Sequence, residues 1–588
     1  MVVLFHLQTP WFSNGFLGVD IFFVISGYLM AKLYNKNTVL GFYRRRLDRL
    51  FSAYIVTILA TVAAGFFMLI PVDLTQLLDQ SASASLFVSN LFYWNQNSYF
   101  DKAAFNPLLN LWSLAVEVQF YLLVPFLYRG IRNKPWIFAL IFFLSITSCF
   151  IVQAISPKTA FFMMPLRVWE FLIGACVAWY PERKPSWLER HKTFFQILLL
   201  GLLCAFPFLV DLKPDATGTL RYGHPALPAL AITLLTGAVI RIGIPSKITM
   251  KGIGWALSKT GDASYSIYLI HFPVIVLCNY APFGGTRLTS ADWQGTAKEI
   301  VLICLLSIFS YIFIEKRLAQ AIDSIYFRWG TIALVLLLSN TLNEISLARY
   351  SDAERNIFSA WTDRDTYRCG KMFRIIHPGE IICNISSVSS GENVLLIGNS
   401  HADSIKKVFS DRAAEAGFTT YFVVSNEPLL GGKPTAEQIV SASLEHKIST
   451  YVIHYSNVYA SEKARKGISE LISLADKNNI KVFLIGPVPT YSEDVPKAML
   501  SDKDGESKIS ATLDGYRERN QAYAAFIKTL DGFNVMTFDP SVYLCPRNGH
   551  CLFSSSTSKP YYFDSSHLTL TGSMQLNPLF VELFSRAQ

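Results

Sequence analysis

Apolar residues follow two different patterns along this chain of 588 residues. Up to about residue 346 they form blocks of roughly 20 residues, the length that an α-helix needs to cross a bilayer. From residue 393 onward, short apolar runs alternate with amphipathic stretches. The sequence therefore predicts a helical membrane half, residues 1–346, and a folded α/β domain, residues 393–588. Residues 347–392 are mixed and polar, and we expect a linker or an irregular extension of the second domain.

The apolar blocks predict ten membrane spans. The first residues begin apolar but reach Pro10 too soon to cross a bilayer, and we expect them to be the outer end of a helix that begins upstream. With that helix the prediction is eleven spans and a cytoplasmic N-terminus. The ten spans are expected at about 16–34, 49–70, 108–128, 135–154, 160–180, 193–211, 225–241, 264–281, 297–315 and 328–346.

The charged residues set the expected orientation. The chain is 51% hydrophobic and 16% charged, with a net charge of +9. A positive balance can indicate a nucleic-acid partner, but here the basic residues gather in alternate short loops, which is how membrane proteins mark their cytoplasmic side. We therefore expect a lipid bilayer and no nucleic acid as partner. The last span then exits outward, and residues 347–588 lie outside the cytoplasm.

The nine cysteines agree with that orientation. Five lie in the apolar spans, where a thiol usually behaves as a small hydrophobic group. The other four form two close pairs in the outer half, which predicts the disulfides Cys369–Cys383 and Cys545–Cys551. A zinc site made of four thiolates is the alternative, but neither pair has CxxC spacing, so we expect no metal.

Regular alternation of strands and helices predicts a three-layer α/β domain with a parallel sheet after residue 393. Ligand sites in such sheets lie at the carboxyl ends of the strands. The expected strands are 393–398, 419–424, 449–454, 480–485 and 533–538, and the expected helices are 402–417, 434–447, 461–478, 510–530 and 569–586.

A serine stands where such a site is expected. In "NVLLIGNSHADS" the first strand breaks at Gly398, and Ser400 stands between this strand and the following helix. A serine nucleophile needs a base and a group that orients the base. Both occur in "YYFDSSHLTLTG", where Asp564 can hold the imidazole of His567 within one turn. Each motif alone is more often a turn or a helix cap, but together at opposite ends of one domain they indicate a catalytic triad.

These motifs resemble the SGNH hydrolase superfamily. The stretch "GNSH" is similar to its first block, with Asn399 in place of the usual aspartate, and Asp564 and His567 match its last block. The resemblance implies oxyanion donors from a glycine and an asparagine of two middle blocks, for which Gly431 or Gly432 and Asn457 are the candidates, beside the amide of Ser400.

Several predicted spans contain ionisable residues. Such groups are costly in lipid and are functional candidates, although buried pairs that lock two helices together are the alternative. His6 lies at the outer edge of the membrane half. The residues within the spans are Asp20, Glu117, Arg167, Glu170 and His271.

The membrane half resembles the acyltransferase 3 family from residue 1 to about 320. The likeness is carried by "GFLGVDIFFVISGYLM", "FYRRRLDRL", "LWSLAVEVQFY", "RVWEFLIGA" and "SYSIYLIHFPV". With an SGNH domain behind it, the chain resembles the fused O-acyltransferases that modify bacterial surface polysaccharides. Two departures are the absence of the family's arginine upstream of His6 and "FIEKRL" in place of the usual Glu-Lys-Pro.

The resemblance implies an O-acetyltransferase of the bacterial inner membrane with a periplasmic SGNH domain. Acetyl-CoA would be the donor and not a bound cofactor, met from the cytoplasm by Arg44, Arg46 and Arg49, with His6 passing a proton or the acyl group. The acceptor would be a lipid-linked or surface glycan, with lipopolysaccharide O-antigen preferred over peptidoglycan and exopolysaccharide. A membrane-anchored glycan esterase and a transporter with a glycan-binding outer domain are the alternatives.

Overall fold

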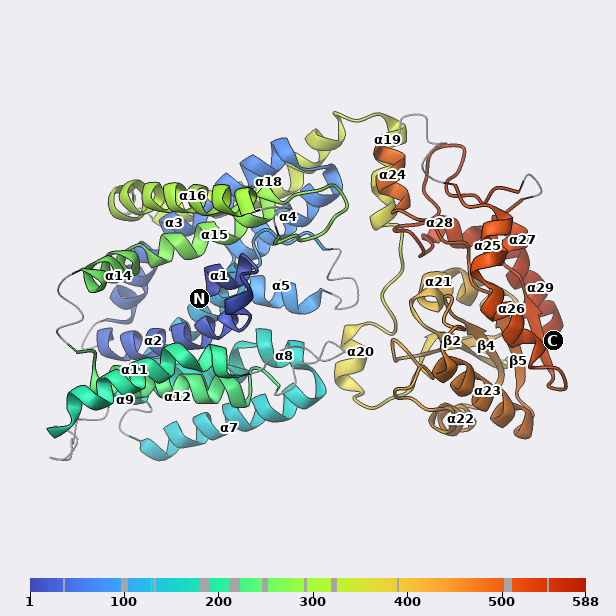
Figure 1. The fold of residues 1–588 in the computed structure, drawn as a ribbon, viewed down its shortest axis with the longest axis horizontal. Helices are drawn as coiled ribbons and strands as arrows, with labels where there is room; N and C mark the ends of the chain where they lie inside the picture. Colours follow the sequence, from blue (N-terminus) through green and yellow to red (C-terminus); the bar gives the residue numbers. More distant parts are fainter. Residues whose placement is uncertain are drawn as a thin grey trace. The chain divides into compact units, whose positions relative to one another are not determined.

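The computed structural model describes the chain except residues 35–37, 97–103, 128–129, 131–133, 180–189, 211–222, 246–251, 290–292, 319–324, 389–390, 502–509 and 547–548. The described residues form two compact units, Met1–Ser346 and Leu347–Gln588 (Figure 1). Several basic loop residues used for the expected topology, among them Arg183 and Lys184, lie outside the described residues.

The elements of the first unit that the structure describes are helices. Its α-helices are α1 (Val2–His6), α2 (Gly18–Leu33), α3 (Val39–Met68), α4 (Pro71–Ser85), α5 (Ser89–Asn95), α6 (Leu111–Phe126), α7 (Pro135–Ile155), α8 (Pro157–Phe162), α9 (Val168–Trp179), α11 (Lys192–Leu209), α12 (Leu227–Ile242), α14 (Ile253–Asp262), α15 (Ser264–Cys278), α16 (Trp293–Phe309) and α18 (Ile325–Leu347).

Each of the ten predicted spans contains a helix. Among the described residues, six helices are long and apolar enough to cross a membrane, and α14 with α15 makes a seventh if this pair, bent by 70°, counts as one span. The helices α6, α9 and α12 are apolar but shorter. The block predicted at 160–180 is broken, because a 3₁₀ turn at Met164–Leu166 separates α8 from α9.

The structure has two further helices, α4 and α5, between residues 70 and 107, a stretch for which the hydropathy pattern predicts no span. The helix α4 is too polar for a span, but it buries Leu74, Leu77 and Leu78 against α3, and the short helix α5 follows it. Pro71 stands at its first turn, a position that favours helix starts. This proline is the feature of the sequence that indicates the start of α4.

The helices α2 and α9 pack with almost no space between their backbones. A Cβ atom at Gly27 would lie 2.0 Å from the carbonyl oxygen of Phe171, and one at Gly174 would lie 2.0 Å from that of Val24. Small residues allow such close approach between helices in membranes. This contact fixes Asp20 on α2 beside Arg167 and Glu170 at the start of α9.

The second unit is an α/β domain. Its elements are α19 (Asp352–Phe358), α20 (Lys371–Ile376), β1 (Ile382–Ser386), β2 (Asn393–Gly398), α21 (Ser400–Glu415), β3 (Thr419–Val423), α22 (Ala436–Glu445), β4 (Ile448–His454), α23 (Glu462–Lys477), β5 (Lys481–Ile485), α24 (Val495–Ser501), α25 (Leu513–Arg519), α26 (Gln521–Lys528), β6 (Val535–Phe538), α27 (Ser541–Leu544), α28 (Leu570–Ser573) and α29 (Asn577–Ala587).

Within the described residues, the sheet has six strands in the order β1-β3-β2-β4-β5-β6. The strands β2 to β6 are parallel, as predicted, but β1 pairs antiparallel with β3, so the sheet is mixed. The strand β1 comes from the segment 347–392. That segment, with α19, α20 and β1, therefore belongs to the compact second unit and is not a bare linker.

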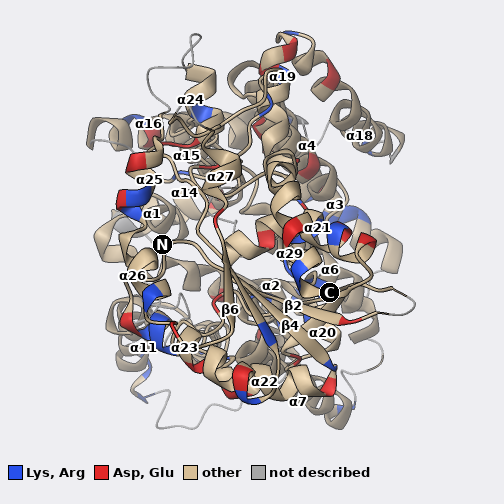
Figure 2. Ribbon diagram, turned by 90° about the vertical axis from the view of Figure 1, so that its right-hand side faces the viewer, with Lys and Arg blue, Asp and Glu red and all other residues tan. Residues whose placement is uncertain are grey.

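Alternate residues of the strands enter two separate cores. On β2, Val394 and Leu396 pack with α21 and α29, whereas Leu395 and Ile397 pack with α22, α23 and α26. This alternation is the period of two expected for a sheet covered on both faces. Figure 2 shows the Lys, Arg, Asp and Glu residues on surrounding helices such as α21 and α22, while β2 and β4 carry none.

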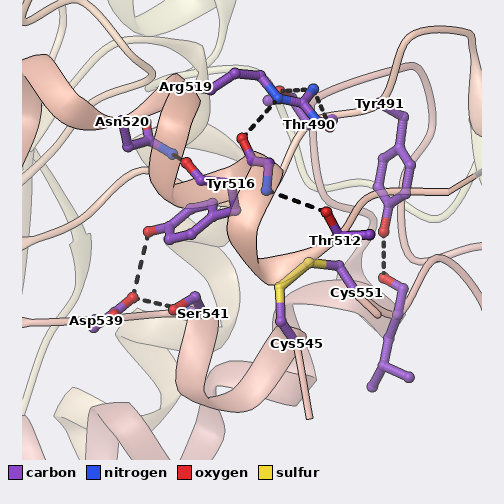
Figure 3. The surroundings of a disulfide bond; sticks show 12 residues. Thr490, Tyr491, Thr512, Tyr516, Arg519, Asn520, Asp539, Ser541, Cys545 and Cys551 are labelled. Atoms are coloured by element: carbon purple, nitrogen blue, oxygen red, sulfur yellow. Dashed lines mark hydrogen bonds between the residues drawn. A yellow bond between two sulfur atoms is a disulfide. The ribbon is translucent and has the colours of Figure 1, made fainter. Parts of the chain in front are cut away.

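Both predicted cysteine pairs are bonded, Cys369 to Cys383 and Cys545 to Cys551. Figure 3 shows the second disulfide beside Thr512, whose hydroxyl accepts a hydrogen bond from Gly515 N at the start of α25. The amide of Cys551 donates to the carbonyl of Ala511. The disulfide and this hydrogen bond thus fix Cys551, from which the chain continues to Asp564 and His567.

Candidate active site

The turn between β2 and α21 presents Ser400 at the carboxyl end of a central strand. A Cβ atom at Gly398 would lie 1.8 Å from the carbonyl oxygen of His454 on β4, so only glycine fits there. Asn399 caps α21, with Oδ1 accepting from the amide of His401 at 3.2 Å. Its Nδ2 donates to Ser456 Oγ at 2.7 Å. The asparagine therefore holds the turn in the place of the family's aspartate.

The second half of the site is a tight turn before α28. Asp564 Oδ1 accepts from the amides of Ser566 at 2.7 Å and His567 at 2.8 Å. Its other oxygen, Oδ2, lies 2.6 Å from His567 Nδ1. Because a carboxylate accepts, Nδ1 carries the proton, and Nε2 of His567 is left as the hydrogen-bond acceptor.

The structure joins these two halves across 167 residues of sequence. His567 Nε2 lies 2.7 Å from Ser400 Oγ, so the hydroxyl donates to the imidazole. Burial would raise the pKa of Asp564, but hydrogen bonds and charge from His567, with the two backbone amides, hold this pKa below its usual value. The result is an ionised aspartate, an oriented imidazole and a serine whose proton has an acceptor in place.

Two further histidines, not assigned from the sequence, lie behind the triad. The ring of His401 is buried and stands 4.6 Å from that of His567, and His454 lies on the far side of His401 at 6.3 Å. Burial, reinforced by the neighbouring histidines, holds the pKa of His401 well below its usual value, and burial lowers the pKa of His454 to about 4. Both rings are neutral at pH 7, so they add no positive charge beside His567.

An arginine from the segment 347–392 stands near the carboxylate. The guanidinium of Arg364 lies 3.9 Å from the ring centre of Trp361 and 4.8 Å from that of Phe563, and the Phe563 ring stacks on His567 at 5.4 Å. Burial lowers the pKa of Arg364 to about 10, while the nearby charge of Asp564 opposes this. The arginine stays cationic at neutral pH. Sequence reasoning missed it because it lies in a stretch without a regular pattern.

The oxyanion candidates stay predictions. Ser400 opens a helix of 16 residues, and its amide lies in the first turn of that helix. Asn457 follows β4, next to Ser456, which contacts Asn399, but its exposed side chain donates to the carbonyl of Arg519. Gly431 lies in the loop after β3 with a φ of 94°.

The polar candidates of the membrane half form two clusters and one pair. In the first cluster, Arg167 lies 2.6 Å from Asp20 and 2.5 Å from Glu170, and all three are fully buried. His224, absent from the sequence prediction, completes it with Nε2 at 3.0 Å from Asp20. An ion cluster of this kind holds helices together, which was the structural alternative for these residues.

The second cluster lines a cavity of about 310 Å³. Glu117 accepts hydrogen bonds from Ser26 and Tyr121 there, and Arg46 and Arg49 from α3 line the same cavity. Among the described residues, Nε of Arg46 and Oε2 of Glu117 are buried without a hydrogen-bond partner. Arg44 is not among the residues that line this cavity.

The remaining pair is formed by two histidines that lie far apart in the sequence of the membrane half. His6 Nδ1 lies 3.0 Å from His271 Nε2, although the residues are 265 positions apart. His271 on α15 is fully buried, whereas His6 on α1 is partly exposed. Within the described part of the chain, no group of three or more His, Cys, Asp or Glu residues is arranged to hold a metal ion.

Comparison with known families accounts for both units. A family model described as the acyltransferase domain, Acyl_transf_3, matches residues 1–315, more than half of the chain. The chain belongs to the acyltransferase 3 family. A second model, described as the SGNH domain fused to AT3 domains, matches residues 339–582, which cover the triad and the whole of the 347–392 segment. This acyltransferase 3 protein is therefore of the fused type, and it is a multi-span membrane protein.

Curated relatives and one solved structure are similar to this acyltransferase 3 protein. The O-acetyltransferase OatA of Staphylococcus aureus is 32% identical over 346 residues, 54% of this chain and 55% of the relative. The peptidoglycan O-acetyltransferase OatA of Listeria monocytogenes is 30% identical over 344 residues, 54% of each chain. The chain thus spans about half the length of the curated relatives it matches. The periplasmic domain of a Salmonella ser. Paratyphi A lipopolysaccharide acetyltransferase is 15% identical with a TM-score of 0.30, covering 40% of this chain and 98% of that domain.

Proposed function

We propose that the protein is a membrane O-acetyltransferase that moves an acetyl group from cytoplasmic acetyl-CoA to a hydroxyl of a bacterial surface glycan. The observation that carries the proposal is the hydrogen-bond chain from Ser400 through His567 to Asp564, within an SGNH domain fused to an acyltransferase domain. The relatives named O-acetyltransferases support this reaction class.

The triad supplies the chemistry of the last step. His567 takes the proton of Ser400 while Oγ attacks the acetyl carbonyl, the bond between the acetyl group and its carrier breaks, and His567 gives that proton to the leaving carrier. Neutral again, His567 takes the proton of an acceptor hydroxyl that attacks the acetyl-serine, and passes it to Ser400 Oγ as the serine leaves. We propose that the amide of Ser400 donates to the oxyanion of each tetrahedral intermediate. Asp564 stabilises the imidazolium that forms in both steps.

The cavity of the membrane half supports acetyl-CoA as donor. Arg46 and Arg49 offer two cations to the phosphates of the coenzyme, and apolar residues such as Leu29 and Leu50 line the same space. A buried guanidinium nitrogen without a hydrogen-bond partner, as in Arg46, is costly unless a ligand satisfies it. We propose Arg46 and Arg49 as donor-binding residues, and His6 as the group that passes the acetyl group on.

The distribution of cysteines supports an orientation with the SGNH domain outside. Both disulfides lie in residues 347–588, whereas all five free thiols lie in residues 1–346. Disulfides persist in oxidising compartments such as the periplasm. We propose the bacterial inner membrane with a periplasmic outer domain.

For the acceptor we propose a lipid-linked surface glycan such as lipopolysaccharide O-antigen. Peptidoglycan is the second candidate, because a relative is named a peptidoglycan O-acetyltransferase. A membrane-anchored deacetylase would use the same triad. The buried ionisable clusters and the cavity favour transfer, since a mere anchor needs neither.

One experiment separates these functions. Cells that lack the gene are complemented with the wild type, Ser400→Ala or Ser404→Ala, and both lipopolysaccharide and peptidoglycan are examined for O-acetyl groups by NMR. Ser404 is the matched control, because it lies on α21 and donates to the carbonyl of His401. We expect acetylation with the wild type and Ser404→Ala and none with Ser400→Ala. Full acetylation with Ser400→Ala refutes the nucleophile, and more acetylation without the gene indicates a deacetylase.

A further inference from the structure

The imidazoles of His6 and His271 face one another inside the membrane half. His6 Nδ1 and His271 Nε2 are 3.0 Å apart, and the rings are nearly parallel, with centres at 5.2 Å and planes inclined by 18°. The deeper histidine is held from behind, since its Nδ1 lies 3.1 Å from the carbonyl oxygen of Ile267 on the same helix. These contacts form a chain from a backbone carbonyl through two imidazoles.

The direction of the hydrogen bonds in this chain follows from its first member. A carbonyl oxygen only accepts, so Nδ1 of His271 carries a proton. In the neutral ring Nε2 then bears a lone pair and must accept, which requires Nδ1 of His6 to donate. The proton of His6 is therefore on Nδ1, and Nε2 of His6 keeps the lone pair that reacts with an electrophile.

We propose that His271 is the positioning partner of His6: it fixes the reactive tautomer of His6 and accepts its Nδ1 proton when Nε2 is acylated. This inference rests on the proposed function of the membrane half. The role is the one that Asp564 has toward His567 in the outer domain. In the membrane half, the fully buried His271 orients the partly exposed His6.

The protons and electron pairs of the acyl step can be followed from the histidine pair to the coenzyme and the acceptor hydroxyl. Nε2 of His6 attacks the acetyl carbon of the thioester, the C–S bond breaks, and its electron pair leaves on the coenzyme thiolate. The Nδ1 proton of the acetylated ring passes to Nε2 of His271, which leaves a neutral acetylimidazole and an imidazolium. When an acceptor hydroxyl takes the acetyl group, the N–C bond breaks toward His6, His271 returns its proton to His6 Nδ1, and the hydroxyl proton neutralises the thiolate.

The reactivity of His6 tests this partnership without any acetyl donor or acceptor. Diethyl pyrocarbonate acylates neutral imidazole nitrogens, and mass spectrometry of the full-length protein gives the rate at each histidine. The exposed His191 serves as the internal reference in each sample. We expect His271→Phe to slow the modification of His6 about tenfold relative to His191. His271→Gln should slow it less, because the amide oxygen still accepts from Nδ1 but takes no proton.

A matched variant separates proton acceptance from packing. The Phe272 ring also contacts His6, at 4.7 Å, so Phe272→Leu disturbs the same wall and leaves the histidine pair. We expect less than a twofold change with this variant. Equal rates at His6 in the wild type and His271→Phe, or equal slowing by His271→Phe and Phe272→Leu, would overturn the proposal. If His271→Phe does not fold, His271→Gln decides, and an unchanged rate at His6 in that variant overturns it too.

If the rates at His6 fall as expected but no variant changes glycan acetylation, the partnership holds and the proposed function fails. If the rates do not change while acetylation is lost with Ser400→Ala, the proposed function holds and the partnership fails. The two hypotheses therefore fail in distinguishable ways.

Discussion

The guanidinium of Arg368 donates to the carbonyl oxygen of Gly398 at 3.0 Å, two residues before Ser400. The same group donates to the carbonyls of Val423 at 3.3 Å and Asn426 at 2.8 Å, and Arg368 is almost fully buried. A residue of the segment 347–392 thus ties together the loops at the carboxyl ends of β2 and β3.

Removal of this arginine should destabilise the outer domain. Arg368→Met leaves two buried and one partly buried carbonyl oxygen without this donor, and we expect a loss of about 3 kcal/mol in the free energy of unfolding. The measurement is chemical denaturation of residues 347–588, a unit with its own two cores and both disulfides. The control is Arg355→Met, whose exposed pairing with Asp352 should contribute under about 0.5 kcal/mol. Equal losses in the two variants would show that the buried contacts of Arg368 are dispensable.

The triad residues should differ in how much each contributes. His567→Ala removes the base, and we expect it to reduce cleavage of an activated acetyl ester by residues 347–588 on the order of 10⁶-fold. Asp564→Asn keeps the hydrogen bonds from the backbone but loses the charge that holds the tautomer, for a loss on the order of 10⁴-fold. Wild-type rates in Asp564→Asn would contradict the role of the carboxylate.

The two halves should also be separable by substrate. Residues 347–588 contain the triad, so we expect them to cleave a small acetyl ester but to use acetyl-CoA poorly, because the cationic cavity is in the other half. His6→Ala in the full-length protein should abolish glycan acetylation and leave ester cleavage intact. Efficient use of acetyl-CoA by the outer domain alone would refute the membrane half as the donor path.

Acid should destabilise the outer domain through its buried histidines. The pKa of His454 is about 4 when folded because of burial, and 6.5 is its ordinary value. Between these values the unfolded chain binds more protons than the folded one, so stability falls as the pH drops below 6.5. At pH 5 the burial of His454 lowers the free energy of unfolding by about 2 kcal/mol relative to its value well above pH 6.5. We expect thermal unfolding of His454→Gln to vary less between pH 7 and pH 5 than that of the wild type, and an identical slope would refute this account.

Thiol labelling should report the cysteine pairing. With the full-length protein denatured but not reduced, we expect labels only on the five free cysteines, Cys149, Cys176, Cys204, Cys278 and Cys304. Reduction before labelling should expose all nine. Nine labels without reduction would contradict both disulfides and the outward placement of the second unit.

The sequence predicted the regular parts of the fold well, because their patterns are local. The strand predicted at 393–398 is β2 to the residue, and the other four differ by at most two residues at either end. The strand β1 was missed, since a short stretch such as "ICNIS" becomes a strand only through its pairing with β3. The helix α4 escapes the hydropathy pattern because it contains many polar residues and does not reach the hydropathy of a membrane span.

The candidate site likewise contains residues that local motifs predict and residues that only tertiary contacts bring into it. Ser400, Asp564 and His567 stand in recognisable motifs, and the structure adds only their distances. His224 and Arg364 stand in irregular stretches, and their partners Asp20 and Asp564 are about 200 residues away along the chain. Such contacts are tertiary, so no periodic pattern in the sequence predicts them.

The order of the triad along the chain has a consequence for how the protein is made. Ser400 comes near the start of the outer domain and His567 near its end, 167 residues later. A ribosome that has reached residue 560 has produced the nucleophile without its base, so a nascent or truncated chain has a serine without the imidazole that activates it. Under the proposed function, ester chemistry therefore begins only once synthesis of the outer domain has reached its last helices.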